Sequence, residues 1–479
     1  MQLAQGRADT REDREDIFVR ASRAIAYVGV AFVLLLHFKI TKGLNLSDGI
    51  FAIAAILLLL SRRPPKPAPR TPAWYVGAFL FVLAGVAASI NSDYKALSLL
   101  VVFNAIYVFF VLQYLLRQLL DTRERIQHAM VAYIVGATVS AFVCILQVGL
   151  HILTFAPSGP GAISGGDTRA IGLSGQPDFA GVSFALGIVF SLGLLVERGW
   201  HRKRWLVACI VVMVVADLLT GSVGGFATTL VGCFALFIVQ GFNLRTVFAV
   251  LLSFAFVYVL VFSVIDPGSN LNLIARIEAT THANGTSNSG TLQLRIDTIK
   301  DGWDGIVQSP ILGHGLDQTT LAVYYDQFLY VHYPPHNMII LYWFGGGIFM
   351  LVGVLIMMGS SVNRLVSGGR LRGKNKDTLR ATVFAACILV VFFSLQAPSF
   401  IDRWLWFVFI LGLCFRDPAV PAPEGIAELP VASARPRRVV GTVGGRGNGE
   451  AVGAHAPASL GQHAPADRGR HAAPGPPRS

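Results

Sequence analysis

Long apolar stretches recur along most of the chain, and they constrain its fold more than any other feature. A helix needs about 20 apolar residues to cross the hydrocarbon of a membrane. Stretches near this length lie at 24–38, 48–60, 73–90, 96–116, 127–150, 179–196, 205–219, 222–240, 246–265, 336–359, 380–396 and 401–415. With 53% hydrophobic and 14% charged residues, the chain is more apolar than a soluble core of its length requires. The sequence therefore predicts an all-α polytopic membrane protein with about 12 transmembrane helices.

Basic residues gather in every second connection between these stretches, which predicts the topology. The basic connections contain Arg62, Arg63, Lys66 and Arg70, then Arg117, Arg123 and Arg125, then Arg198, Arg202, Lys203 and Arg204, and finally Arg364, Arg370, Arg372, Lys374, Lys376 and Arg380. Because Lys and Arg are retained on the cytoplasmic side, both termini are expected in the cytoplasm. The net charge of +12 is thereby explained by topology, and nothing in the sequence resembles a nucleic-acid-binding module.

The same alternation divides the chain into regions. Residues 1–23 form a cytoplasmic N-terminus, 24–265 hold the first nine transmembrane helices with an external loop at 152–178, and 266–335 form a large external loop. Residues 336–416 hold the last three helices, and the Pro-, Gly- and Ala-rich residues 417–479 are expected to be a disordered cytoplasmic tail. All five cysteines lie in or beside apolar stretches without paired spacing, so no disulfide or zinc site is indicated.

The large external loop contains an amphipathic helix. Apolar side chains recur at helical spacing at Leu292, Ile296, Ile299, Trp303 and Ile306, while Lys300, Asp301 and Asp304 fall largely on the other face. The polar run "NGTSNSGT" predicts its start and Ser309-Pro310 its end. The apolar stripe is expected to pack on the bundle or to lie at the membrane interface, with Arg295 near the border between the faces.

His336 is a candidate catalytic residue. Pro334-Pro335 suits the start of a helix, which places His336 and Asn337 in its first turn at the outer membrane surface. The positive end of a helix disfavours imidazolium, which keeps a neutral nitrogen available to accept a proton. The alternative is that His336 caps the helix or packs among aromatic residues.

The shorter external loop reads "SGGDTRAIGLSGQPDFAG", and Arg169 is its single basic residue. Such an arginine is usually solvated or paired with a nearby acid, here Asp167. The functional alternative is an anion clamp, because a guanidinium donates a planar fork to phosphate oxygens and keeps its charge. Asp217, near the outer end of its apolar stretch, is also a candidate because an acid within a membrane span often has a function, although it can also reach the interface.

Four motifs in order resemble the bacterial O-antigen ligase and polysaccharide polymerase superfamily. They are "TRAIGLSGQPDFAG", "LTGSVGG", "LRIDTIKDGWDGIVQSPILGHGLD" and "HNMIILYWFGGG". The most specific part is the Arg, Trp, Pro and Gly-x-Gly series of the loop helix followed by His-Asn. The chain departs from the family pattern at Ser222-Val223, where Ser-Arg is frequent, at Met350 in the glycine pattern after His-Asn, and at Asp178, where Asn is common.

The resemblance implies a fold like that of GT-C glycosyltransferases and transfer of a glycan from undecaprenyl pyrophosphate to an acceptor hydroxyl, with inversion and without a metal or other cofactor. It implies that the enzyme lies in the bacterial inner membrane, with its site facing the periplasm. Arg169 and Arg295 would hold the pyrophosphate, His336 would activate the acceptor, and Asn337 and His314 would contribute to substrate binding. Asp301 and Asp304 are expected to solvate their helix face rather than hold a metal.

The acceptor stays open between lipid A core, a growing polysaccharide, and a Ser or Thr side chain of a protein. A polytopic polysaccharide transporter or flippase is the main alternative from another class, and a non-catalytic membrane scaffold is a second. Transporters place their sites at the midplane and often contain repeated halves, and neither feature is evident here. The expected partners are the lipid-linked glycan, its acceptor and membrane lipid.

Overall fold

A computed structural model of the protein describes residues 17–33, 39–41, 44–61, 71–150, 170–197, 203–241, 290–316, 322–326, 329–332, 334–367, 377–398 and 401–415, with a few isolated residues between them. Its helices are α2 (Ile17–Phe32), α3 (Leu46–Leu59), α4 (Pro72–Asn91), α5 (Lys95–Ile106), the π-helix η1 (Tyr107–Leu112), α6 (Gln113–Leu119), α7 (Arg123–Gly149), α8 (Pro177–Val196), α9 (Lys203–Leu219), α10 (Val223–Gln240), α13 (Gly290–Gln308), α14 (Met338–Val366), α15 (Thr378–Ser394) and α16 (Arg403–Cys414). Two short antiparallel hairpins pair β1 (Lys39–Thr41) with β2 (Leu44–Asn45) and β3 (Ala322–Asp326) with β4 (Leu329–His332). The described structure is therefore predominantly helical.

Most helices follow the predicted apolar stretches where the structure describes them, but α2 begins at Ile17, within the predicted N-terminal region 1–23, and ends at Phe32 rather than near residue 38. Among the described residues, six helices could cross a membrane, judged by length and composition alone: Pro72–Asn91, Lys95–Leu119, Arg123–Gly149, Pro177–Val196, Val223–Gln240 and Met338–Val366. Shorter apolar helices are Leu46–Leu59, Thr378–Ser394 and Arg403–Cys414. The predicted span 246–265 lies outside the described residues except for four positions within it. The chain is thus a multi-pass membrane protein, and the count of about 12 spans stays a prediction.

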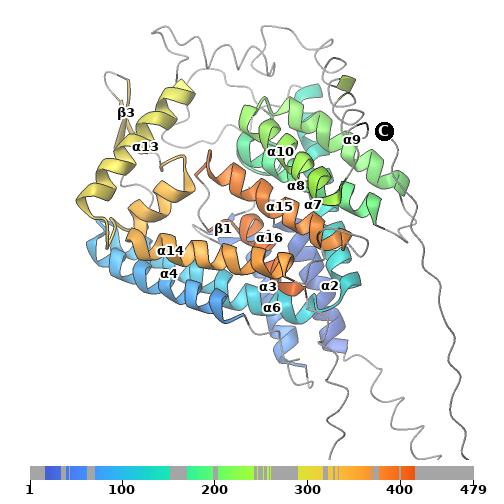
Figure 1. Ribbon diagram of the computed structural model, residues 1–479, viewed down its shortest axis with the longest axis horizontal. Coiled ribbons are helices and arrows are strands. Elements are labelled where there is room, and N and C mark those ends of the chain that lie inside the picture. The colour runs from blue at the N-terminus through green and yellow to red at the C-terminus, as the bar shows by residue number, and fades with distance from the viewer. Residues whose placement is uncertain are drawn as a thin grey trace, which may run out of the picture. The chain divides into compact units, whose positions relative to one another are not determined.

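Helices α4 and α14 run side by side (Figure 1). Two glycines allow their close approach, because a Cβ atom added to Gly77 would lie 2.5 Å from the carbonyl oxygen of Gly353. In the reverse direction, a Cβ atom on Gly353 would lie 2.6 Å from the carbonyl oxygen of Gly77. Small residues commonly let membrane helices meet at backbone contact, where dispersion replaces the hydrophobic effect as the main attraction.

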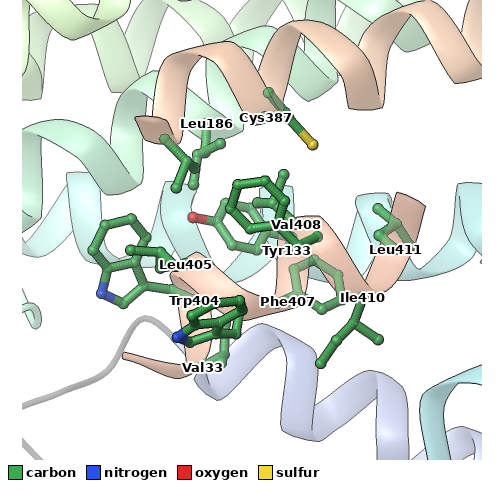
Figure 2. Close-up of a cluster of buried hydrophobic side chains, with 14 of the residues drawn as sticks. Val33, Tyr133, Leu186, Cys387, Trp404, Leu405, Phe407, Val408, Ile410 and Leu411 are labelled. Atoms are coloured by element: carbon green, nitrogen blue, oxygen red, sulfur yellow. The ribbon is translucent and has the colours of Figure 1, made fainter. Parts of the chain in front are cut away.

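Helix α16 is buried on every face, which is typical of a helix at the centre of a large bundle. Its aromatic and aliphatic side chains meet Tyr133 of α7 and Leu186 of α8 in the core (Figure 2). The rings of Tyr133 and Phe407 are stacked with centroids 5.9 Å apart. At the start of α16, the buried Arg403 forms an ion pair with Asp48, N to O 2.9 Å, so this charge is compensated inside the bundle.

Helix α14 is not the continuous span that the sequence predicted, because its backbone leaves the helical conformation at Gly346 and Gly347. The segment before α14 fills the break. The backbone N–H groups of His314 and Gly315 donate to the carbonyl oxygens of Phe344 and Gly345 at 2.9 and 2.8 Å, and Ile348 N–H donates to the Pro310 oxygen at 3.0 Å. These bonds satisfy groups that a broken membrane helix would otherwise leave exposed to lipid.

Helix α13 has the predicted position in the chain, starting within "NGTSNSGT" and ending just before Ser309-Pro310. Its buried face is narrower than predicted. Thr298, Gly302 and Ile306 are buried, whereas Ile296 and Trp303 of the apolar stripe are 39% and 48% exposed. Ile306 is the stripe residue that is buried, and Ile299 is partly buried, so the stripe packs on the bundle only in part. A position of the exposed stripe residues at the membrane interface stays a prediction.

Candidate functional site

Several helix ends meet where the predicted site residues lie. Hydrogen bonds there join the start of α8 to that of α10, and the end of α15 to the starts of α10 and α14, while α13 packs on α14 and reaches α8 through Arg295. Each helix start carries N–H groups without helical partners and a positive partial charge. At two of these starts Ser222 and Asn337 cap N–H groups, and at the third the carboxylate of Asp178 lies beside Arg295.

Arg295 is the first predicted residue of this site. Its Nη2 donates to Oδ2 of Asp178 at 3.2 Å, and both side chains remain about one-third exposed, at 28% and 32%. Asp178 lies in the first turn of α8, directly after Pro177, which suits that position because its fixed φ fits a helix start. The other carboxylate oxygen accepts a hydrogen bond from Ser222 Oγ at 2.6 Å. One acid thus joins α8, α10 and α13.

His336 lies beside this ion pair. The pKa of its imidazole is lowered from 6.5 to about 4, mainly by burial and also by the charge of Arg295, and Asp178 and a hydrogen bond with the Pro334 backbone oppose this shift. At pH 7 the ring is therefore neutral and can accept a proton. The predicted direction is confirmed, although the causes are burial and Arg295 rather than the helix end.

The expected placement of His336 and Asn337 in the first turn is wrong by about one position. Asn337 is the N-cap of α14, and its Oδ1 accepts from the N–H groups of Ile339 and Ile340 at 2.9 and 3.3 Å. A capping side chain precedes the helix that it caps, which leaves His336 just outside the helix. Asn337 Nδ2 donates to the carbonyl oxygen of Leu395 at 3.1 Å, so the same side chain that caps α14 also joins it to the end of α15.

Gln396, which follows α15, completes the connections between these helix ends. Its Nε2 donates to the carbonyl oxygen of Gly224 at 3.3 Å and to Thr228 Oγ1 at 3.1 Å, both in α10. Contacts therefore lead from α13 to α8, then to α10, α15 and finally α14. The series closes because α14 packs on α13, and Pro335, just before α14, lies beside Gly302 of α13. We call this closed series of contacts the helix-end ring.

His314 follows α13 in the chain and contacts that helix near its end, away from Arg295. Its Nε2 is 2.8 Å from the carbonyl oxygen of Gly305, and its ring stacks on Phe344 with centroids 4.7 Å apart. Gly305 is about 15 Å along the helix from Arg295 at 1.5 Å per residue. The structure therefore brings Arg295 and His336 together, and places His314 where it fixes α13 on the first part of α14.

Arg169 lies outside the described residues, which resume at Ala170. Lys300 and Asp304, predicted on the polar face of α13, are exposed, and Asp301 is partly exposed. Burial and the neighbouring carboxylates of Asp297 and Asp304 raise the pKa of Asp301. Within the described part of the chain, no group of three His, Cys, Asp or Glu side chains is arranged to hold a metal ion.

Asp217 is buried rather than at the interface. It is 2% exposed, and its Oδ2 accepts a hydrogen bond from Thr229 Oγ1 at 2.7 Å. Its Oδ1 faces the point where α8 and α10 cross, and Cβ atoms added to Gly181 or Gly225 would lie 3.1 and 3.3 Å from it. Asp217 therefore lies inside the bundle, against the helices α8 and α10 that take part in the helix-end ring, and its side chain is not exposed at the site.

Sequence reasoning noted Asp178 and Ser222 only as departures from a family pattern, and it did not single out Gln396. Signals for the first two were present. An acid directly after a proline that starts a helix is favoured by the helix dipole, and Ser222 precedes the helix whose start it caps through Gly225 N–H at 2.9 Å. Gln396 gave no local signal, because its partners lie in a helix about 170 residues away.

The comparison with protein families covers the part of the chain that contains most of this site. Residues 208–355 match the O-antigen ligase family model. The match extends from α9 into α14 and includes Ser222, Arg295, His314, His336 and Asn337. No curated protein matches the chain significantly. The resemblance drawn from the sequence motifs is thus confirmed over residues 208–355, where this multi-pass membrane protein matches the O-antigen ligase family.

Proposed function

We propose that the protein is a glycosyltransferase of the O-antigen ligase or polymerase type, with a GT-C-like fold of about 12 transmembrane helices. It would move a glycan from undecaprenyl pyrophosphate to an acceptor hydroxyl at the periplasmic face of the inner membrane. The observation that carries the proposal is that Arg295 and His336, selected from the sequence as phosphate ligand and base, lie close enough for Arg295 to lower the pKa of His336.

The proposed reaction is a single displacement. The acceptor oxygen attacks the anomeric carbon, the bond from that carbon to the phosphate oxygen breaks, and pyrophosphate leaves with the electron pair. The proton of the acceptor hydroxyl passes to the neutral imidazole of His336. Arg295, with Arg169 from the external loop, would stabilise the charge that develops on the leaving group. Attack from the side opposite the leaving group inverts the anomeric centre.

The remaining candidates have supporting functions in this proposal. Asn337 caps the helix after His336 and, with its remaining amide hydrogen, would contact substrate. His314 would act on the substrate through the placement of α13. Because fixed guanidinium groups supply the positive charge, transfer is expected to proceed without a metal ion, and full activity in the presence of EDTA would support that expectation.

The test of the function is deletion of the gene, followed by separate analysis of lipopolysaccharide, secreted polysaccharide and glycoproteins. Loss of long glycans in one fraction, restored by the intact gene, would support transfer and identify the acceptor as lipid A core, polysaccharide or protein. If all three fractions keep their glycans, the proposal is wrong. Accumulation of lipid-linked glycan on the cytoplasmic side would instead indicate a transporter or flippase.

The pH dependence of transfer tests the assignment of His336. Since the neutral ring is the active form, kcat/KM is expected to be level near pH 7 and to fall as the pH drops through about 4, where the pKa of His336 lies. Initial rates of the detergent-solubilised protein from acid to neutral pH would measure this, with size-exclusion profiles as the control for unfolding. A rate that falls near pH 6.5, or rises in acid, would contradict the assignment.

A further inference from the structure

Asp178 contacts two elements outside its own helix, and the two contacts use different oxygens. Oδ1 accepts from Ser222 Oγ at 2.6 Å, and Oδ2 accepts from Arg295 Nη2 at 3.2 Å. Ser222 is itself held, because its Oγ accepts from the backbone N–H of Gly225 at 2.9 Å. A carboxylate bonded on both oxygens has little freedom to rotate, so it restricts the direction in which the guanidinium can point.

We propose that Asp178 is a positioning residue of the site: it holds the guanidinium of Arg295 beside His336, and Ser222 holds Asp178 in turn. The inference rests on the proposed function, because the orientation of Arg295 matters only if Arg295 acts on an anionic leaving group. Its basis is the contacts among α8, α10 and α13, and those contacts exist whatever the acceptor is.

The ion pair between Arg295 and Asp178 is partly exposed, and this fits a role in positioning Arg295 better than a role in stabilising the fold. Exposed ion pairs contribute at most about 1 kcal/mol to folding, so the contact with Asp178 has little weight in stability. A guanidinium has five N–H donors, and the contact with Asp178 uses one of them at Nη2. Arg295 can therefore stay on Asp178 while it donates to a phosphate, and the carboxylate sets the angle of the donors that remain.

Asp178 also affects His336 through its charge. The charged groups that bear on His336 are Arg295 of α13, which lowers its pKa, and Asp178 of α8, which raises it. If the carboxylate loses its charge, Arg295 acts on the imidazole unopposed and the pKa of His336 falls further. An effect on His336 therefore accompanies the effect on Arg295 and gives a second, independent measurement.

The first experiment is Asp178→Asn, which keeps the shape of the side chain and removes its charge. We expect kcat to fall about tenfold, the effect of about 1.4 kcal/mol on the barrier, because the guanidinium loses its fixed direction. KM for the lipid-linked glycan should not rise, since Arg295 keeps its charge and the N–H donors that do not contact Asp178 remain available to phosphate. The matched control is Asp304→Asn, the same change at an exposed position of α13, which should leave both constants unchanged.

A double-mutant cycle tests whether Asp178 acts through Arg295. In an Arg295→Lys background the planar fork is already lost, so Asp178→Asn should cost no more than about twofold in kcat. Equal losses in both backgrounds would overturn the proposal. The rate at which diethyl pyrocarbonate modifies His336, followed by peptide mass spectrometry across pH, should show a lower pKa in Asp178→Asn, and an unmoved pKa would also count against it.

Two further results separate this inference from the function on which it rests. If Arg295→Ala and His336→Ala keep normal transfer, the proposed function fails. If they lose transfer while Asp178→Asn keeps the kcat of the unaltered protein, only the positioning role fails. Should Asp178→Asn reduce the amount of folded protein, Ser222→Ala replaces it, because that change releases Asp178 without altering any charge. A normal kcat in Ser222→Ala would then overturn the proposal.

Discussion

Replacing Arg295 by alanine is expected to lower the rate of glycan transfer about 100- to 1,000-fold, the usual cost of removing one fixed donor that faces developing negative charge. The leaving pyrophosphate would lose its guanidinium contact, and Asp178 would lose the cation that now compensates it. The measurement is the initial rate of transfer by purified protein, with a synthetic lipid-linked glycan as donor. Membrane abundance should not change, because the ion pair is partly exposed and contributes little to folding.

Lys300→Ala is the matched control for this prediction. It removes a positive charge from the same helix at an exposed position, and it should leave transfer unaltered. Arg295→Lys should fall between the two, because lysine keeps the charge and loses the planar fork. If Arg295→Ala transfers glycan at the normal rate, Arg295 is not a leaving-group ligand.

Replacing Gly347 by alanine is expected to prevent the normal assembly of α14, with a loss of several kcal/mol. Gly347 has φ +71° and ψ −177°, a region that is almost restricted to glycine and costs about 1–3 kcal/mol for other residues. The added methyl group would also overlap the backbone carbonyl of Ile311, which lies in the segment that fills the break. The measurement is the melting temperature in detergent, together with the amount of protein in the membrane.

Gly359→Ala provides the control on the same helix. A Cβ atom there has no neighbour within 4 Å, and alanine is a better helix former than glycine by about 1 kcal/mol. That variant should be as stable as the unaltered protein or slightly more stable. Equal melting temperatures for both variants would mean that the break in α14 is not a fixed part of the fold.

The parts of the fold that were predicted correctly depend on local periodicity. Runs of apolar residues gave the helices of the bundle, and the amphipathic pattern gave α13 between its polar start and Ser309-Pro310. The break in α14 was missed because "GGG" inside an apolar run does not by itself interrupt a hydropathy profile. It forms because "SPILGHGL" supplies backbone partners from outside the helix, and such pairing leaves no trace in the helix's own pattern.

The sequence predicted individual residues of the candidate site, such as Arg295 and His336, better than the contacts that join them to the rest of the protein. Arg295 was predicted as a phosphate ligand through the family resemblance, and His336 through its position near a helix start together with the same resemblance. The partner of Arg295 was not predicted, since Asp178 is 117 residues away in the chain and was noted only as a replacement for asparagine. Packing of Gly302 and Gly305, rather than the larger apolar residues, determined which face of α13 turned inward.

If the proposed function is correct, the break in α14 would also set the depth of His336 relative to the bilayer. Residues 347–366, which follow the break, are about 30 Å long as a helix, which alone matches the thickness of the hydrocarbon. The short piece before the break is then free to lie among the lipid headgroups, and His336 at its start would work in contact with water and with the polar head of a lipid. A carrier lipid could accordingly keep its tail in the membrane while its sugar reached the histidine, without leaving the bilayer between one transfer and the next.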